Sequence, residues 1–167
     1  FKPLIIVVNV DETQMSSGEY PGREEAYAWA EMRDIPIFEI SVEMEKEINE
    51  LDPSEQEMFL EEMGIGERGI SKLARSVYSC LGLISFLTAG KDEVRAWTIR
   101  QGTCAKEAAG KVHSDIERGF IRAEVISFED FIKCGSEKAA KEKGLYRLEG
   151  KEYIVKDGDI INFRFNV

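Results

Sequence analysis

The hydrophobic period of residues 93–125 changes twice, from that of a strand to that of a helix and back to that of a strand. Few small domains have elements in this order. Residues 94–99 predict a strand, and Gln101-Gly102 predict a turn after it. Thr103 is expected to cap a helix. The apolar residues of that helix have the i, i+3, i+4, i+7 spacing of a buried face: Ala105, Ala108, Ala109 and Val112. A strand, a helix and a strand with a closing hairpin form the layout of a β-grasp domain, which defines a fold and no function.

The strand expected after Gly119 has a period of two. One face should carry Phe120, Arg122 and Glu124, and the other Ile121, Ala123 and Val125. A short helix is expected over 136–143, closed by Gly144. Turns at 149–150 and 156–159 should separate the last strands, which are expected over 145–148, 151–155 and 160–165. These strands would complete the sheet.

A βαβ unit opens the chain. Residues 4–8 form a continuous apolar run, as expected for a strand of a parallel sheet that is covered on both faces. A polar loop is expected around Ser16-Ser17-Gly18, then a helix to residue 33, then a strand over 37–40. The helix should turn three residues inward: Ala26, Trp29 and Ala30. The crossover should be right-handed.

Three helices and a domain boundary are expected next. The first helix covers 43–50, and the second begins at Asp52-Pro53-Ser54-Glu55, which supplies an N-cap, a proline at N1 and an acid at N3. We expect the acidic faces of both helices to be solvated. Apolar residues at helical spacing predict a third helix over 70–84, and residues 86–90 are expected to be the passage into the last domain. The chain therefore divides into an α/β portion, 1–85, and an α+β portion, 86–167.

The net charge of −10 is unevenly distributed along the chain. Residues 1–85 carry 7 Lys and Arg against 18 Asp and Glu, whereas residues 86–167 carry 15 against 14. A polyanion such as RNA would be repelled by the first half and tolerated by the second.

Cysteine and histidine usage bounds the chemistry. The three cysteines, Cys80, Cys104 and Cys134, have no CxxC spacing, so we expect buried thiols in a reducing, cytoplasmic compartment. His113 is the single histidine and is expected to pack or cap a helix rather than act in catalysis. No apolar run reaches the roughly 18 residues of a membrane span. Because the chain starts without Met and directly before a strand, we interpret it as the C-terminal portion of a longer protein.

Asn9-Val10-Asp11-Glu12 follows the first expected strand at its C-terminal end. Ligands of open α/β sheets bind just beyond such ends. An Asn amide can face a purine edge, and a nearby carboxylate can accept from ring or exocyclic N–H groups. Ser41-Val42 ends the next strand and could meet the same base. The alternatives are an ordinary polar loop for the first segment and a helix N-cap for Ser41.

Basic residues of the second half could form a phosphate-contacting surface, with Arg95, Lys111 and Arg122 as its main candidates. The alternative is a generic soluble surface, because acidic residues are interspersed. No residue in the chain resembles a nucleophile with its base, and we expect no metal site here.

Several motifs together resemble the YchF family of Obg-like ATPases, which belongs to the translation-factor (TRAFAC) class of P-loop NTPases. Asn9 to Glu12 resembles that family's N-x-x-E signature. Further similar motifs follow in the family's order through residues 65–167, at 86–90, 93–98, 111–115, 117–124, 128–131, 147–151 and 157–167. The last domain is similar to a TGS domain, a β-grasp (ubiquitin-like) module.

The resemblance implies the end of a P-loop NTPase sheet joined to a TGS domain, in a cytoplasmic, monomeric protein that hydrolyses ATP, and in some members GTP, with Mg²⁺ and associates with ribosomes. Carried over by position, the base contacts would be Asn9, Val10 and Glu12, buttressed by Ser41 and Val42. The phosphate-binding loop and the Mg²⁺ ligands would lie upstream, so this portion alone should not hydrolyse nucleotide. A non-enzymatic β-grasp module that binds RNA or protein remains the alternative.

Overall fold

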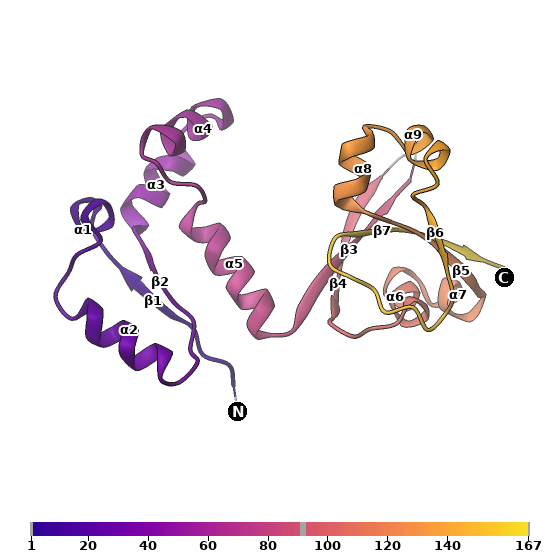
Figure 1. The fold of residues 1–167 in the computed structure, drawn as a ribbon, viewed down its shortest axis with the longest axis horizontal. Helices are drawn as coiled ribbons and strands as arrows, with labels where there is room; N and C mark the ends of the chain where they lie inside the picture. The colour runs from indigo at the N-terminus through magenta and orange to yellow at the C-terminus, as the bar shows by residue number, and fades with distance from the viewer. Residues whose placement is uncertain (1, 91–92, 167) are drawn as a thin grey trace. The chain divides into compact units, whose positions relative to one another are not determined.

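The computed structural model describes residues 2–90 and 93–166, which divide between Leu81 and Gly82 into two compact units. Figure 1 shows the first unit in indigo to magenta and the second in rose to yellow. The division falls before strand β3 (Leu83–Ala89), which joins the sheet of the second unit. Residues 83–85, placed in the first portion by the sequence, therefore belong to that sheet.

The first unit opens with the expected βαβ arrangement. Its elements are β1 (Ile6–Asn9), α1 (Glu12–Ser17), α2 (Arg23–Glu31) and β2 (Ile37–Ile40). The two strands are parallel, with Ile6 opposite Ile37 and Asn9 opposite Ile40. The carboxyl ends of both strands therefore meet at one edge, and this edge carries the candidate site.

Three local predictions for this unit were wrong. Ser16 and Ser17 end helix α1 rather than forming a loop, because the Asp11 side chain accepts from Gln14 N at 2.8 Å and nucleates the helix. Trp29 is 43% exposed, with the Arg33 guanidinium 4.1 Å from its ring centroid, whereas Ala30 is buried as expected. Strand β1 is not covered on both faces by the described residues, because Val7 is 38% exposed.

Three helices follow β2: α3 (Val42–Glu50), α4 (Pro53–Glu62) and α5 (Gly69–Cys80). The start of α4 is as predicted, since Asp52 N donates to Glu55 Oε2 at 3.1 Å and Pro53 occupies N1. Helix α5 is shorter than predicted. It ends at Cys80 because Gly82 turns the backbone with φ of 61°, and Ile84 belongs to β3 instead.

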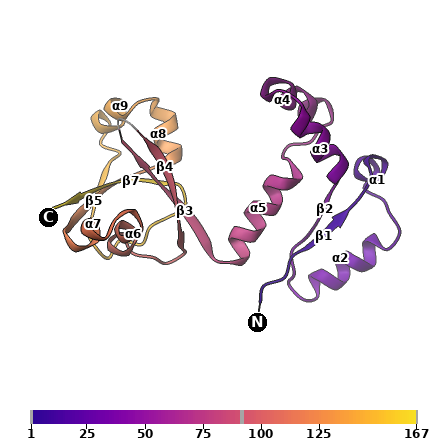
Figure 2. The ribbon, with the colours of Figure 1, turned by 180° about the vertical axis from the view of Figure 1, so that it is seen from behind.

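The second unit is a mixed five-stranded sheet with the order β4-β3-β7-β5-β6. Strands β3 and β7 are parallel and the other neighbours are antiparallel. In Figures 1 and 2, α6 and α7 lie on one side of this sheet, and α8 and α9 on the other. The further elements are β4 (Val94–Arg100), α6 (Ala105–Val112), α7 (Ser114–Arg118), β5 (Phe120–Ser127), α8 (Phe128–Cys134), α9 (Glu137–Glu142), β6 (Arg147–Glu149) and β7 (Asp159–Phe165).

Each face of this sheet has its own core. The stripe predicted on α6 is confirmed, because its three alanines are fully buried against Phe86, Ile99 and Phe163. The smaller core on the other face joins Ile126 and Ile160 to Ala140 of α9. The two cores together fix which side chains of each strand face which helices.

Four predictions for the second unit need correction. Residues 86–90 lie mostly in strand β3 rather than in a passage. Cys104, not Thr103, occupies the N-cap of α6, because the Thr103 hydroxyl donates to Arg100 O at 2.7 Å. Residues 151–155 form no strand, since only Ile154 makes an isolated bridge, to Cys104. A bulge between Phe120 and Arg122 moves Phe120 to the core side and leaves Ile121 60% exposed.

The structure also shows the state of the three cysteines and the role of the single histidine. All three cysteines are free thiols, as expected, but they are half-buried rather than buried. His113 caps a helix as predicted, because its Nδ1 accepts from Asp115 N at 3.2 Å. Helices with the length and hydropathy needed to cross a bilayer are absent from residues 2–90 and 93–166.

Candidate functional site

The ends of β1 and β2 are joined by one side chain, that of Asn9. Its Oδ1 accepts a hydrogen bond from Val42 N at 3.2 Å, and Val10 N donates to Ile40 O at 3.0 Å. The segment after β1 is thereby fixed to the start of α3. Because Asn9 is exposed and its Oδ1 accepts this bond, its amide nitrogen is a donor that can face a ligand.

The other residues of the N-x-x-E segment differ in what they can offer. Val10 is 5% exposed, so only its main chain could reach a ligand. Asp11 is engaged as the cap of α1, with its amide also donating to Gln14 Oε1 at 3.1 Å. Glu12 lies in the first turn of α1 with an exposed side chain. The available groups at this edge are therefore the Asn9 amide and the Glu12 carboxylate.

Ser41 and Val42 contribute in different ways. Ser41 is 2% exposed, and its hydroxyl accepts from Met44 N at 3.4 Å, so the helix-capping interpretation of this residue is confirmed. Val42 is 57% exposed beside Asn9. A ligand at this edge would meet the Val42 side chain, while Ser41 holds the backbone behind it.

A cluster of polar side chains surrounds Glu39 and was not predicted from the sequence. The hydroxyl groups of Tyr27 and Tyr20 donate hydrogen bonds to its carboxylate at 2.5 and 3.2 Å, and Arg23 Nε donates another at 3.2 Å. Burial favours a raised pKa for Glu39, but the bonds from Tyr27 and Tyr20 and the Arg23 charge outweigh it and lower the pKa. Burial and the bond to Glu39 raise the pKa of Tyr27. An acid inside the apolar strand segment Ile37–Ile40 is the sequence signal for such a cluster.

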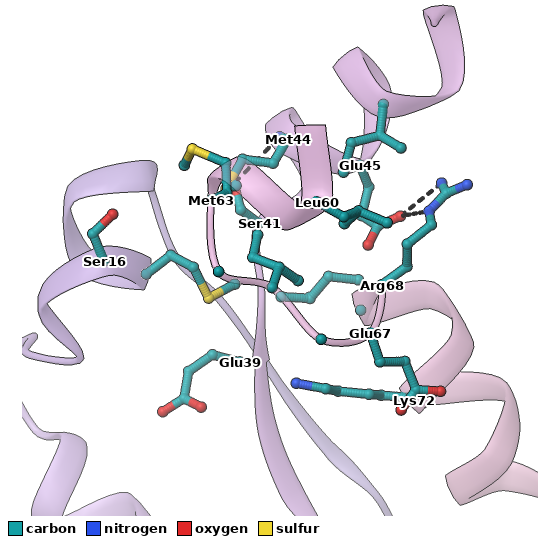
Figure 3. Close-up of a pocket in the computed structure, with 17 residues that line it drawn as sticks. Ser16, Glu39, Ser41, Met44, Glu45, Leu60, Met63, Glu67, Arg68 and Lys72 are labelled. Atoms are coloured by element: carbon teal, nitrogen blue, oxygen red, sulfur yellow. Dashed lines mark hydrogen bonds and ion pairs between the residues drawn. The ribbon is translucent and has the colours of Figure 1, made fainter. Parts of the chain in front are cut away.

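A cavity of about 350 Å³ lies behind the strand ends, between α1, β2 and the loop before α5 (Figure 3). Its wall includes Arg68, which donates two hydrogen bonds to Glu45 at 2.8 and 3.0 Å, and Figure 3 shows these side chains facing each other. Ile70 N also donates to Glu45 Oε1 at 3.3 Å. The expectation that the acids of α3 are solvated is therefore wrong for Glu45, which is 14% exposed in this ion pair.

The three basic candidates of the second unit do not share one face. Arg95 lies on the α6 side of the sheet, where its guanidinium is 4.3 Å from the Trp97 ring centroid. Lys111 is on α6 itself. Arg122 has the opposite side-chain direction from Ala123 and lies on the side of α8 and α9. Any single anion-binding surface can contain Arg95 and Lys111, or Arg122, but not all three.

No group of three or more His, Cys, Asp or Glu side chains able to hold a metal ion comes together among the described residues.

Comparison with protein families places this chain. The family model YchF-GTPase_C, described as a protein of unknown function (DUF933), matches residues 83–166, just over half of the chain. Strand β3 lies within this match, in agreement with the division of the structure.

Relatives are found along the whole chain. The chain is 48% identical to the "Ribosome-binding ATPase YchF" of Bacillus subtilis, and the match covers 99% of this chain and 46% of that relative. It is 45% identical to the protein of the same name in Haemophilus influenzae, covering 45% of it, and 42% identical to "Obg-like ATPase 1" of Gallus gallus, covering 42% of it. The chain thus spans less than half the length of these relatives.

The fold is also that of a known class. The structure of the Schizosaccharomyces pombe YchF GTPase matches with a TM-score of 0.85 and 29% identity, over 97% of this chain and 43% of that one. A GTP-binding protein from Pyrococcus horikoshii shares the fold, with a TM-score of 0.65 and 17% identity. The chain belongs to the YchF family.

Proposed function

We propose that this chain is the C-terminal part of a ribosome-associated, nucleotide-hydrolysing regulator that uses ATP and possesses some activity towards GTP. Its first unit would be the end of a P-loop NTPase domain and would recognise the purine base. Its second unit would be a TGS domain of the β-grasp type. The names of the relatives, ribosome-binding ATPase and Obg-like ATPase, favour this proposal over a non-enzymatic binding module. The protein would act in the cytoplasm as a monomer.

One observation supports base recognition above the others. Asn9 Oδ1 is fixed by Val42 N at 3.2 Å, so the ends of both strands present one edge with an amide donor and the exposed Glu12 carboxylate. A purine offers a ring acceptor to the amide and N–H groups to the carboxylate. In many GTPases an Asp accepts from two guanine N–H groups, and the longer Glu12 would relax that selection for guanine.

The phosphate-binding loop and the Mg²⁺ ligands would come from residues outside this segment. The cation and the phosphate cradle supply most of the catalysis in this class of enzyme. Hydrolysis would therefore require the remainder of the protein.

Replacing Glu12 tests base recognition. In the full-length protein, we expect Glu12→Ala to raise the Kd for ATP by about tenfold, because a hydrogen bond to a charged group contributes about 1.5–3 kcal/mol. Glu24→Ala is the matched control, since Glu24 is also an exposed acid in the first turn of a helix, α2. Isothermal titration with ATP and GTP measures both variants. Equal ATP affinities for the two variants, or about a hundredfold preference of the unmodified protein for GTP, would contradict the proposal.

Ribosome association tests the second unit. A surface on the α6 side would use Arg95 and Lys111, whereas one on the side of α8 and α9 would use Arg122. Phosphate contacts are additive and depend on salt, so we expect reversal of the charges on the contacting side to reduce co-sedimentation with ribosomes several-fold at moderate salt. Arg95→Glu with Lys111→Glu is compared with Arg122→Glu, each in the full-length protein. Unchanged pelleting by both variants would remove these residues from the ribosome-contacting surface.

A further inference from the structure

Strand β7 has a neighbour along only part of one edge. Its pairing with β5 continues to Phe165, opposite Phe120, whereas its ladder with β3 contains the single pair Leu87–Ile160 among the described residues. Figures 1 and 2 both show the β3–β4 hairpin diverging from β7 beyond that pair. Among the described residues, no strand pairs with the β3-facing edge of β7 from Asn162 to Phe165, and this edge of the sheet is therefore open.

Alternate residues of this stretch direct their main-chain groups towards the gap. Asn166 N donates to Gly119 O at 2.9 Å, on the β5 side. Successive residues of a strand direct their N–H and C=O groups to alternate sides. Phe165 and Phe163 therefore direct these groups away from β5, where a further strand could pair with them.

Two cavities flank the same edge. One, of about 430 Å³, lies on the α6 side and is lined by Val112, Ile116 and Phe165; the other, of about 520 Å³, lies on the side of α8 and α9 and is lined by Phe131 and Tyr146. Both cavities also share lining residues at the gap: Ala89, Gly90, Ile161 and Asn162. An extended segment added to β7 would send alternate side chains into the two cavities, because strand side chains alternate between faces.

The charges of these walls indicate what that segment carries. Among the described residues that line the two cavities, Glu93 and Glu137 are the charged ones, and no Lys or Arg is present. Lys141 already pairs with Glu137 at 2.5 Å, outside the lining, which leaves Glu93 as the stronger attractor of an incoming cation. A Lys side chain could lay its aliphatic stem on Val112 and Ile116 and place its ammonium group near Glu93.

We propose that the open edge of β7 binds an extended peptide segment of a partner protein with alternating apolar and basic residues. Main-chain pairing with Phe163 and Phe165 would supply affinity, and the two cavities would select the side chains.

An acetylated and amidated hexapeptide of alternating Val and Lys tests this proposal. Added at about 1 mM to the 167-residue chain, a concentration suited to weak binding, it should shift the amide NMR signals of Phe163 and Phe165. Phe165→Pro removes both the Phe side chain and the outward N–H, whereas Phe165→Ala removes the side chain and keeps the N–H. We expect Phe165→Pro to weaken peptide binding at least about tenfold more than Phe165→Ala.

Further peptides protect the test against a misfolded variant. Two Val–Lys hexapeptides are N-methylated at alternate residues, one at the odd and one at the even positions. We expect one of the two to bind the unmodified chain about tenfold more weakly than the unmethylated peptide. A Val–Glu hexapeptide should also bind about tenfold more weakly than the unmethylated Val–Lys peptide. Absence of signal shifts, equal binding by the Pro and Ala variants, or equal binding of the Val–Glu peptide would overturn the proposal. Shifts that arise on concentrating the chain without peptide would also overturn it, because a second copy would then be the occupant.

Discussion

Phe86→Ala is expected to destabilise the second unit by about 3–5 kcal/mol, the range for truncating a fully buried Phe. Phe86 has no exposed surface and lies in β3, the strand between β4 and β7. Its ring packs edge-on against Phe163, with centroids 5.9 Å apart and planes at 87°. Truncation would leave a cavity under α6 and remove this aromatic contact, and the close-packed alanines of α6 cannot fill the space.

Hydrogen exchange localises this effect. Amides of β5 and β7 in Phe86→Ala should lose protection by about a hundredfold or more, while amides of β1 and β2, in the other unit, should be unchanged. Phe128→Ala is the matched control, because Phe128 is 49% exposed and should cost less than about 1 kcal/mol. A similar loss for both variants would show that Phe86 is not a central element of this core.

Periodicity predicted the elements whose burial is decided within one segment. The alanine stripe of α6 and strands β2 and β4 were predicted from sequence, because their apolar residues follow the helical or strand period. Strand β3 was missed in part because an apolar run that ends in Ala89 and Gly90 resembles a linker as much as a central strand. In the structure β3 pairs along its whole length with β4, and its described pair with β7, Leu87–Ile160, joins residues more than 70 positions apart.

The candidate site shows the same division. The positions of Asn9 and Glu12 at a strand end follow from the sequence, but the bond from Val42 N to Asn9 requires the parallel register of β1 and β2. The Glu39 cluster likewise depends on helix α2 lying over β2, which brings Tyr27 to the carboxylate. Separation of Arg95 and Arg122 onto opposite faces was not predictable, since it depends on how two distant strands are oriented in one sheet.

Gly119→Val is expected to cost the second unit about 3 kcal/mol, at the upper end of overpacking effects. The φ of Gly119 is −88°, so backbone strain is not the cause. A Cβ atom there would lie 2.8 Å from the carbonyl carbon of Asn166, and closer still to its oxygen. Because this neighbour is backbone, and Asn166 N donates to Gly119 O at 2.9 Å, the new side chain must push the end of β7 away from the start of β5.

Gly150→Val is the control for this variant, since no atom lies within 4 Å of the Cβ that it would add and its φ is not positive. Urea unfolding of both variants, followed by hydrogen exchange at β5 and β7, separates local contact from a general effect of valine. If the two variants were equally stable, the strand ends would be free to separate without cost. That result would also remove the fixed register on which the outward direction of the Phe163 and Phe165 amides depends, because the Gly119–Asn166 bond sets it.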